Sequence, residues 1–252
     1  MVKQSGLGSN LFVDQYDVSG DIGAINSIVT SRSLLDVTGL DKSAFERILG
    51  LRDGAISYTA FWNIAAGQAH IALSSLPTTD RVMSLFVAPL TVGSAAASIL
   101  AKQVTYAPTR GQDGSLKAGI NGVANANGLE WSGGGLGDGM LTTGKQTFAS
   151  GTQNGTSVDY GATSTLFGAA AYLHVFSLGS GTPTVTIADS ANDSTFTPIT
   201  GLAFSPTVAY AERLQTATNA TIRQYVRVQI SGTYTNLVCA VNFVRYTETI
   251  AT

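Results

Sequence analysis

The fold class is decided by residues 221–230, which read TIRQYVRVQI. Side chains alternate along this stretch, apolar at Ile222, Val226, Val228 and Ile230 and polar or long at Arg223, Tyr225, Arg227 and Gln229. This alternation is the pattern of a strand that buries one face, and residues 55–62 (AISYTAFW) repeat it. Both stretches therefore predict half-buried strands.

Composition extends this reading to the whole chain of 252 residues. Only 12% of the residues are charged, against roughly 25% in a typical soluble domain. Hydrophobic residues make up 44%, which is enough for a core, and 28 glycines favour turns over helices. We expect a mostly β protein, with further strands at 10–13, 34–37, 81–87, 98–106, 169–178, 183–188 and 237–245.

A glycine-rich run divides the chain in two. Residues 132–139 read SGGGLGDG, and no lysine follows Lys145. Five glycines in eight residues are costly to order, so residues 132–149 are predicted to be a linker or loop. The sequence thus predicts a β domain over 1–131 and a β-sandwich over 150–252. One short helix is expected at 44–49, because Ser43 and Glu46 have capping-box spacing and Gly50 follows.

Several function classes lose support from the same residues. A net charge of −2 argues against an electrostatic nucleic-acid binder. One cysteine and two histidines give little with which to build a metal site, and no cofactor is expected. Residues 139–146 match a phosphate-loop pattern except that Gln146 replaces the hydroxyl residue. No nucleophile elbow is present either, so we expect no enzyme. No apolar run reaches membrane-spanning length, so no membrane insertion is expected.

Two groups of side chains are candidate surfaces. Asp14, Asp17 and Asp21 cluster in a stretch with turn composition, which indicates a solvated acidic face. Arg223, Tyr225 and Arg227 share one face of the predicted strand at 221–230 and could contact a sugar or a partner. An ordinary solvated strand face explains the second group better, because exposed faces of antiparallel sheets commonly carry such side chains.

The N-terminal half resembles a known family. The run at 34–54, LLDVTGLDKSAFERILGLRDG, is followed by AFWN at 60–63, LSSLPTTD at 73–80, AKQVTY at 101–106 and PTRG at 108–111. Together these runs resemble the major tail, or tail tube, proteins of long-tailed, non-contractile bacteriophages. The resemblance covers residues 5–131 best, and residues after it look like the extra sandwich that many such proteins carry.

The resemblance implies a tail-tube-like β-sandwich or barrel with one flanking helix, plus an Ig-like C-terminal sandwich outside the tube. It implies self-association into hexameric rings, which stack into a tube through which DNA passes. A tape measure protein and a tail terminator would be partners. The protein would belong to the virion tail and be assembled in the host cytoplasm. Candidate lumen or inter-ring residues are Asp14, Asp17, Asp21 and Arg32. Loops at 14–32 and 90–97 are expected to order only on assembly.

Two alternatives remain open at this stage. The chain could be a capsid decoration or minor tail protein, which differs from a tube subunit in copy number and location. Its C-terminal module could instead recognise a cell-surface glycan through exposed aromatic side chains such as Tyr210, Tyr225 and Tyr234. The sequence does not fix the faces on which these tyrosines lie.

Overall fold

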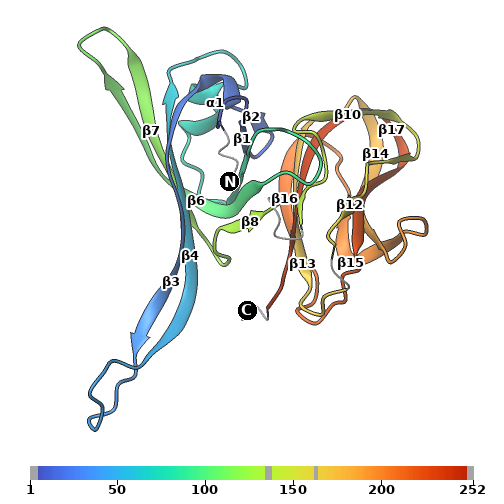
Figure 1. The fold of residues 1–252 in the computed structure, drawn as a ribbon. Helices are drawn as coiled ribbons and strands as arrows, with labels where there is room; N and C mark the ends of the chain where they lie inside the picture. Colours follow the sequence, from blue (N-terminus) through green and yellow to red (C-terminus); the bar gives the residue numbers. More distant parts are fainter. Residues whose placement is uncertain (1–4, 134–137, 162–163, 249–252) are drawn as a thin grey trace. The chain divides into compact units, whose positions relative to one another are not determined.

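The computed structural model describes residues 5–133, 138–161 and 164–248, and it is mostly β as predicted. The chain forms two compact units. Unit 1 consists of residues 1–20, 82–98 and 131–252, and unit 2 of residues 21–81 and 99–130. Figure 1 shows the strands of both units and the short helix α1. The units are discontinuous in sequence, so the chain does not divide at one point near residue 131.

Unit 1 contains a two-layer sandwich. Its strands are β13 (Ala169–Ser177), β14 (Ser180–Ser190), β15 (Thr197–Phe204), β16 (Tyr210–Gln215) and β17 (Tyr225–Arg245). They are ordered β15-β14-β17-β13-β16. The first half of β17 pairs with β14 and the second half with β13, so β17 belongs to both layers. The strands predicted at 221–230 and 237–245 are therefore one strand, because β14 pairs with the residues between them.

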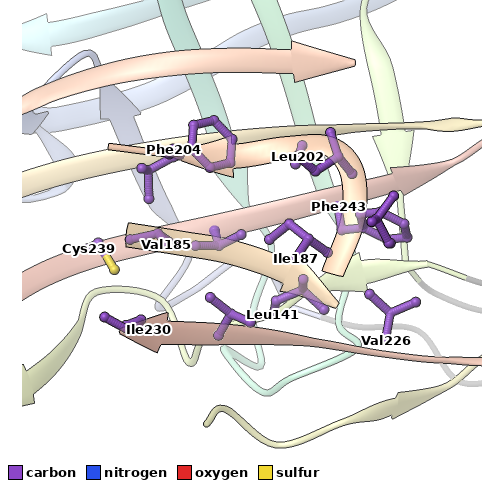
Figure 2. Packing of buried hydrophobic residues seen from close by; sticks show 14 of the residues in the cluster. Leu141, Val185, Ile187, Leu202, Phe204, Val226, Ile230, Cys239 and Phe243 are labelled. Atoms are coloured by element: carbon purple, nitrogen blue, oxygen red, sulfur yellow. The ribbon is translucent and has the colours of Figure 1, made fainter. Parts of the chain in front are cut away.

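The sandwich core is apolar and continuous. Figure 2 shows side chains of β14, β15 and both halves of β17 packed together, among them Ile187, Phe204, Ile230 and Phe243. These four side chains are at most 1% exposed. The predicted alternation is confirmed in β17, where Val226, Val228 and Ile230 are fully buried and their neighbours are half-exposed.

Three N-terminal strands belong to the same unit. They are β1 (Asn10–Val13), β2 (Tyr16–Asp17) and β5 (Arg81–Phe86), of which only Arg81 falls in unit 2. β1 pairs with β2 and β5. Phe12 and Phe86 form a second cluster with Ala240 of β17, and Phe176 of β13 packs against it. The layer formed by β1 and β5 thus covers the outer face of β13 and the second half of β17.

The predicted linker is largely an ordered edge of the sandwich. Its segments β9 (Gly139–Met140), β10 (Gln146–Ser150), β11 (Gln153–Asn154) and β12 (Val158–Asp159) pair in succession with β17. The prediction of a linker or loop is wrong where β9 and β10 form, whereas residues 141–145 between them are a bend; residues 134–137 of that prediction lie outside the described residues. Gly139 has φ +152°, and a Cβ there would lie 2.8 Å from the backbone of Gly93. This glycine permits close packing and does not mark flexibility.

Unit 2 is an antiparallel sheet ordered β6-β7-β4-β3. Its strands are β3 (Ile22–Asp36), β4 (Arg47–Phe61), β7 (Leu116–Ala124) and most of β6 (Ala96–Arg110), which begins in unit 1. The short strand β8 (Glu130–Ser132) and the 3-10 turn Ser19–Asp21 lie at the unit boundaries. The predicted loop at 14–32 is wrong in its second half, which is the start of β3.

The predicted helix at 44–49 is wrong, because this segment closes the β3–β4 hairpin. Arg47 begins β4 and lies opposite Asp36, and the Thr38 hydroxyl accepts a hydrogen bond from the backbone N–H of Glu46 at 2.9 Å. Strand pairing has overridden the local capping signal. The helix of this unit is α1 (Ala69–Leu73), and its Ala69 N–H is capped by the carboxylate of Asp21 at 2.9 Å. Because that cap comes from a distant residue, the local sequence does not reveal it.

Candidate functional site

The outer part of the β3–β4 hairpin is a two-stranded ribbon. β7 pairs with β4 only from Ala55 to Phe61, so residues 47–54 have β3 as their one described partner. Figure 1 shows this hairpin in blue, running far beyond the stretch that β7 accompanies. A two-stranded ribbon alone is marginally stable in water, so an ordered hairpin of this length calls for a further partner.

Large apolar side chains are exposed mainly on unit 2. Of the 20 such exposed side chains among the described residues, 16 lie in unit 2, although it holds fewer than half of the residues. Eleven of them belong to the hairpin: Ile25, Val29, Leu34, Leu35, Val37, Leu40, Phe45, Ile48, Leu49, Leu51 and Phe61. We call this set the hairpin surface. Concentrated apolar exposure of this kind marks an interaction site, whereas scattered single residues do not.

The charges of the hairpin are balanced. Between residues 22 and 61 there are four basic and four acidic residues. Asp36 lies directly opposite Arg47, and Lys42 is 3.4 Å from Glu46. A mixed surface of this kind suits a protein partner with mixed charge, and it does not form the basic stripe that a nucleic acid would need.

Among the described strands, β3 is the last on one side of the unit 2 sheet. On the other side β6 has β5 as its neighbour, but β5 has six residues and β6 has fifteen, so part of β6 extends beyond β5. All pairings between them are antiparallel, so β6 and β4 run one way and β7 and β3 run the other. An unpaired edge carries free N–H and C=O groups and is a template for pairing with another chain.

One face of this sheet carries small, uncharged side chains. A cross-strand row runs Ser27, Ser57, Asn121 and Thr105, and the next row runs Ala24, Thr59, Gly119 and Ala107. These residues are half-exposed or exposed. The opposite face carries Ile56, Tyr58 and Ala60, which are buried. The sheet therefore has an apolar inner face and, on its outer face, two rows of small uncharged side chains, next to which Phe61 lies opposite Lys117.

The predicted acidic cluster does not form one solvated face. In unit 1, Asp14 accepts a hydrogen bond from the Val82 N–H at 2.9 Å, and Asp17 lies 2.9 Å from the Lys145 ammonium. Burial alone would raise the pKa of Asp17, but hydrogen bonds from Ser19 and the Lys145 charge bring it below its ordinary value. These carboxylates stabilise turns of their own unit.

The two other residues of that prediction lie in unit 2. Asp21 is buried and binds the side-chain amide of Asn63 at 2.8 Å in addition to capping α1. Arg32 lies opposite Arg52 on the exposed hairpin. Arg52 in turn lies 3.9 Å from the buried carboxylate of Glu130. The structure does not bring Arg32 together with the three aspartates.

The predicted arginine and tyrosine face is half-exposed. Arg223 lies 3.4 Å from Asp189, and the guanidinium of Arg227 lies 3.8 Å from the ring centre of Phe196. The neighbouring Asp159 carboxylate raises the pKa of Tyr225 above its ordinary value. Tyr225 and Arg227 share one face of β17, whereas Arg223 lies two residues before that strand begins, and all three side chains have intramolecular partners.

A serine and a histidine meet inside unit 1, but they are inaccessible. His174 Nε2 lies 2.8 Å from the Ser84 hydroxyl, and His174 Nδ1 lies 2.7 Å from the Asp14 main-chain oxygen. Both side chains are fully buried, so no substrate reaches them. Among the described residues no group of three His, Cys, Asp or Glu side chains is arranged to hold a metal ion. No helix in the described ranges has the length and apolar character to cross a membrane.

Comparisons with known proteins give distant likenesses only. No family model matches the chain, and no curated protein matches it. A solved chain from the "Virion of native gene transfer agent (GTA) particle" aligns over 52% of this chain and 99% of its own length. Its identity is 14% and its TM-score 0.41.

A second solved structure is that of the Dit protein of phage SPP1. Its description calls it a paradigm of the hub adsorption apparatus in phages that infect Gram-positive bacteria. The alignment spans 94% of this chain and 99% of the Dit chain, with 11% identity and a TM-score of 0.34. At these identities and scores neither likeness says what this chain does.

Proposed function

We propose that this chain is a structural subunit that assembles with copies of itself into the rings of a phage tail tube. The observation that carries the proposal is the hairpin surface of unit 2. It is apolar, long, balanced in charge and two-stranded at its end, which are the properties of a segment that becomes buried against another protein chain. The resemblance of residues 5–131 of the chain to tail tube sequences supports the same role.

Strand direction supports a ring. In a head-to-tail contact, the free edge of β3 in one copy meets the part of β6 that extends beyond β5 in the next copy. Because β3 and β6 run in opposite directions within one sheet, the new pair would be antiparallel like all the others. A head-to-tail contact generates a closed ring when its rotation closes, and a closed ring leaves no free edge. Six copies per ring is the number that the family resemblance implies.

The two rows of uncharged side chains suit the lining of the ring. We assign the row of Ser27, Ser57, Asn121 and Thr105 to the inner wall of the tube. Phosphate contacts with lysine and arginine are what hold DNA on a protein surface, so a wall of hydroxyl and amide groups lets DNA slide. In this arrangement the two rows add no charge to the lumen, and Asp14, Asp17 and Asp21 do not line it.

Unit 1 fits the outside of the tube. It carries four of the 20 exposed large apolar side chains, which is an ordinary surface for a protein facing water. This role makes the protein a virion component of the tail, assembled in the host cytoplasm. A decoration or minor tail role, with glycan binding on the face of Arg223, Tyr225 and Arg227, is the alternative.

Electron microscopy of the purified full chain at rising concentration tests the proposal. Rings or tubes of regular width are the expected result, and their diameter gives the number of copies. Particles that stay monomeric at every concentration, together with glycan-array binding that is lost in Tyr225→Ala, would replace the tube role by the decoration role. Tyr234, which is buried, is no candidate for such binding.

A further inference from the structure

A chain of hydrogen bonds crosses the interior of unit 1. It runs from the main-chain oxygen of Asp14 through His174, Ser84 and Ser98 to Asn242. The Asn242 oxygen accepts a last hydrogen bond, from the Ser132 hydroxyl, at 2.5 Å. The five side chains of this hydrogen-bonded network are fully buried. Buried polar networks are favourable only when each member is satisfied, so this one sets a single arrangement of the strands it joins.

The chain of bonds joins two layers. Ser84 belongs to β5 and the Asp14 oxygen to the turn between β1 and β2, whereas His174 belongs to β13 and Asn242 to β17. The layers also meet through the apolar side chains of Phe12, Phe86, Phe176 and Ala240, and through the ion pair of Asp17 with Lys145. His174 lies among them, with its ring centre 5.7 Å from that of Phe12 and 6.3 Å from that of Phe176.

The hydrogen bonds form a continuous donor-to-acceptor series when the histidine is a neutral ring. A carbonyl oxygen only accepts, so Nδ1 of His174 carries the hydrogen and donates to Asp14. Nε2 then accepts from the Ser84 hydroxyl, which accepts from the Ser98 hydroxyl at 2.7 Å. Ser98 accepts in turn from the Asn242 amide nitrogen at 2.9 Å. Protonation turns Nε2 into a donor, so Ser84 has to accept that bond, and the hydroxyl hydrogen of either Ser84 or Ser98 then loses its acceptor within the network.

Asp14 favours the protonated ring through its main-chain oxygen and its charge, but burial of the ring outweighs both. On the β1–β2 turn the Asp14 carboxylate already accepts from the Val82 N–H. Beyond Phe176, the Lys145 ammonium is paired with Asp17. On β13 the hydroxyl of Tyr172 accepts from Arg213 at 3.0 Å. β5 and β17 present only Ser84 and Asn242 to the network. Burial accordingly lowers the pKa of His174 from its ordinary 6.5 to about 4.

We propose that His174 is an acid-sensitive latch, which holds the β1–β5 layer on the sandwich and releases that layer when its ring is protonated. The sandwich core on the other face of β13 and β17 has no part in the network and stays packed. This inference goes beyond the proposed function and does not depend on it. It concerns one folded chain and needs no assembly.

The protein contains its own reporter for whether the sandwich core stays packed. Cys239 is the sole cysteine of the sequence, and it is fully buried in the sandwich core. A dipyridyl disulfide, which reacts with thiols even in acid, labels Cys239 only where that core opens. Pulsed hydrogen exchange read by mass spectrometry follows the amides of β1 and β5 in the same samples. His70, the second histidine, lies half-buried in unit 2 and provides the matched control variant His70→Gln.

The full chain is incubated at a series of pH values from about 7 to about 3. In wild type and His70→Gln we expect amide protection in β1 and β5 to fall at least about tenfold in acid, with Cys239 still unreactive. His174→Gln, which stays neutral, keeps its protection at the same pH. Should that variant fail to fold, the ring resonance of His174 is followed by NMR in His70→Gln. Its titration midpoint then has to coincide with the release of β1 and β5.

Three results would overturn the latch. The first is labelling of Cys239 at the same pH at which the amides open, because the whole unit would then unfold together. The second is an equal acid midpoint for His174→Gln and wild type. The third is release of β1 and β5 at a pH where the ring of His174 has not titrated.

Discussion

The assembly surface is tested most sharply at Leu34 and Leu49. These side chains lie directly opposite each other on the hairpin and are 57% and 63% exposed in the single chain. Full burial of a leucine contributes about 1.5–3 kcal/mol, so covering these exposed parts contributes about 1–2 kcal/mol for each residue. The double variant Leu34→Ser with Leu49→Ser should therefore weaken each contact between copies by about 2–3 kcal/mol, or about 30- to 150-fold in affinity.

Sedimentation velocity over a concentration series measures this loss as a shift of assembly to higher concentration. Leu166→Ser is the matched control, because Leu166 is also 63% exposed but lies in unit 1. The free energy of unfolding of the monomer should change by less than about 0.5 kcal/mol in either variant, as is usual for exposed positions. Equal effects of the two variants on assembly, or no effect of the hairpin variant, would refute the reasoning.

Three further predictions concern stability. Arg81→Met should lower the free energy of unfolding by about 1–3 kcal/mol in urea titrations, because the Ala72 oxygen loses its 2.8 Å bond from the buried guanidinium; the exposed Arg110→Met should not. Gly139→Ala should lower the free energy of unfolding by about 1–3 kcal/mol, since φ is +152° and the added methyl meets Gly93. Gly119→Ala is the neutral comparison, because an added Cβ there has open space around it. Because burial lowers the pKa of His174, the unfolded chain binds a proton that the folded chain does not bind between about pH 6.5 and pH 4. The free energy of unfolding should therefore fall by about 3 kcal/mol over this range, and a flat pH profile of stability would contradict the prediction.

Much of the β architecture is present in local patterns. The alternation at 55–62 and 221–230 identifies β4 and β17 and assigns their buried faces correctly, because a strand with one buried face repeats every two residues. The alternating pattern does not predict residues 231–236, which join the strands predicted at 221–230 and 237–245 into β17. Pairing with β14 keeps that interval extended, and this pairing is a tertiary fact with no local signature.

The errors share a physical cause, which is that partners distant in sequence decide local structure. The helix predicted at 44–49 is lost to cross-strand pairing with residues 34–36, and α1 depends on a cap from Asp21. Gly139, one of the glycines of the predicted linker, allows two backbone segments to approach closely. The aspartates read as solvated are bound within the fold, as Asp21 shows most clearly.

The hairpin surface itself was detectable only in part. The apolar pairs Leu34-Leu35 and Ile48-Leu49 are plain in the sequence, but adjacent apolar residues fit a strand buried on both faces as well as one exposed on both. The structure separates these cases, since the residues pair as a ribbon without a covering layer among the described residues.

Hydrogen exchange of the assembled particle against the monomer tests the central claim most directly. Pairing of β3 with β6 of the next copy predicts new amide protection in residues 22–36 and 103–110, with no gain in β15 or β16, the edge strands of the sandwich. Protection gained in β15 or β16 in place of β3 and β6 would contradict the account, as would a particle in which the hairpin amides exchange as fast as in the monomer.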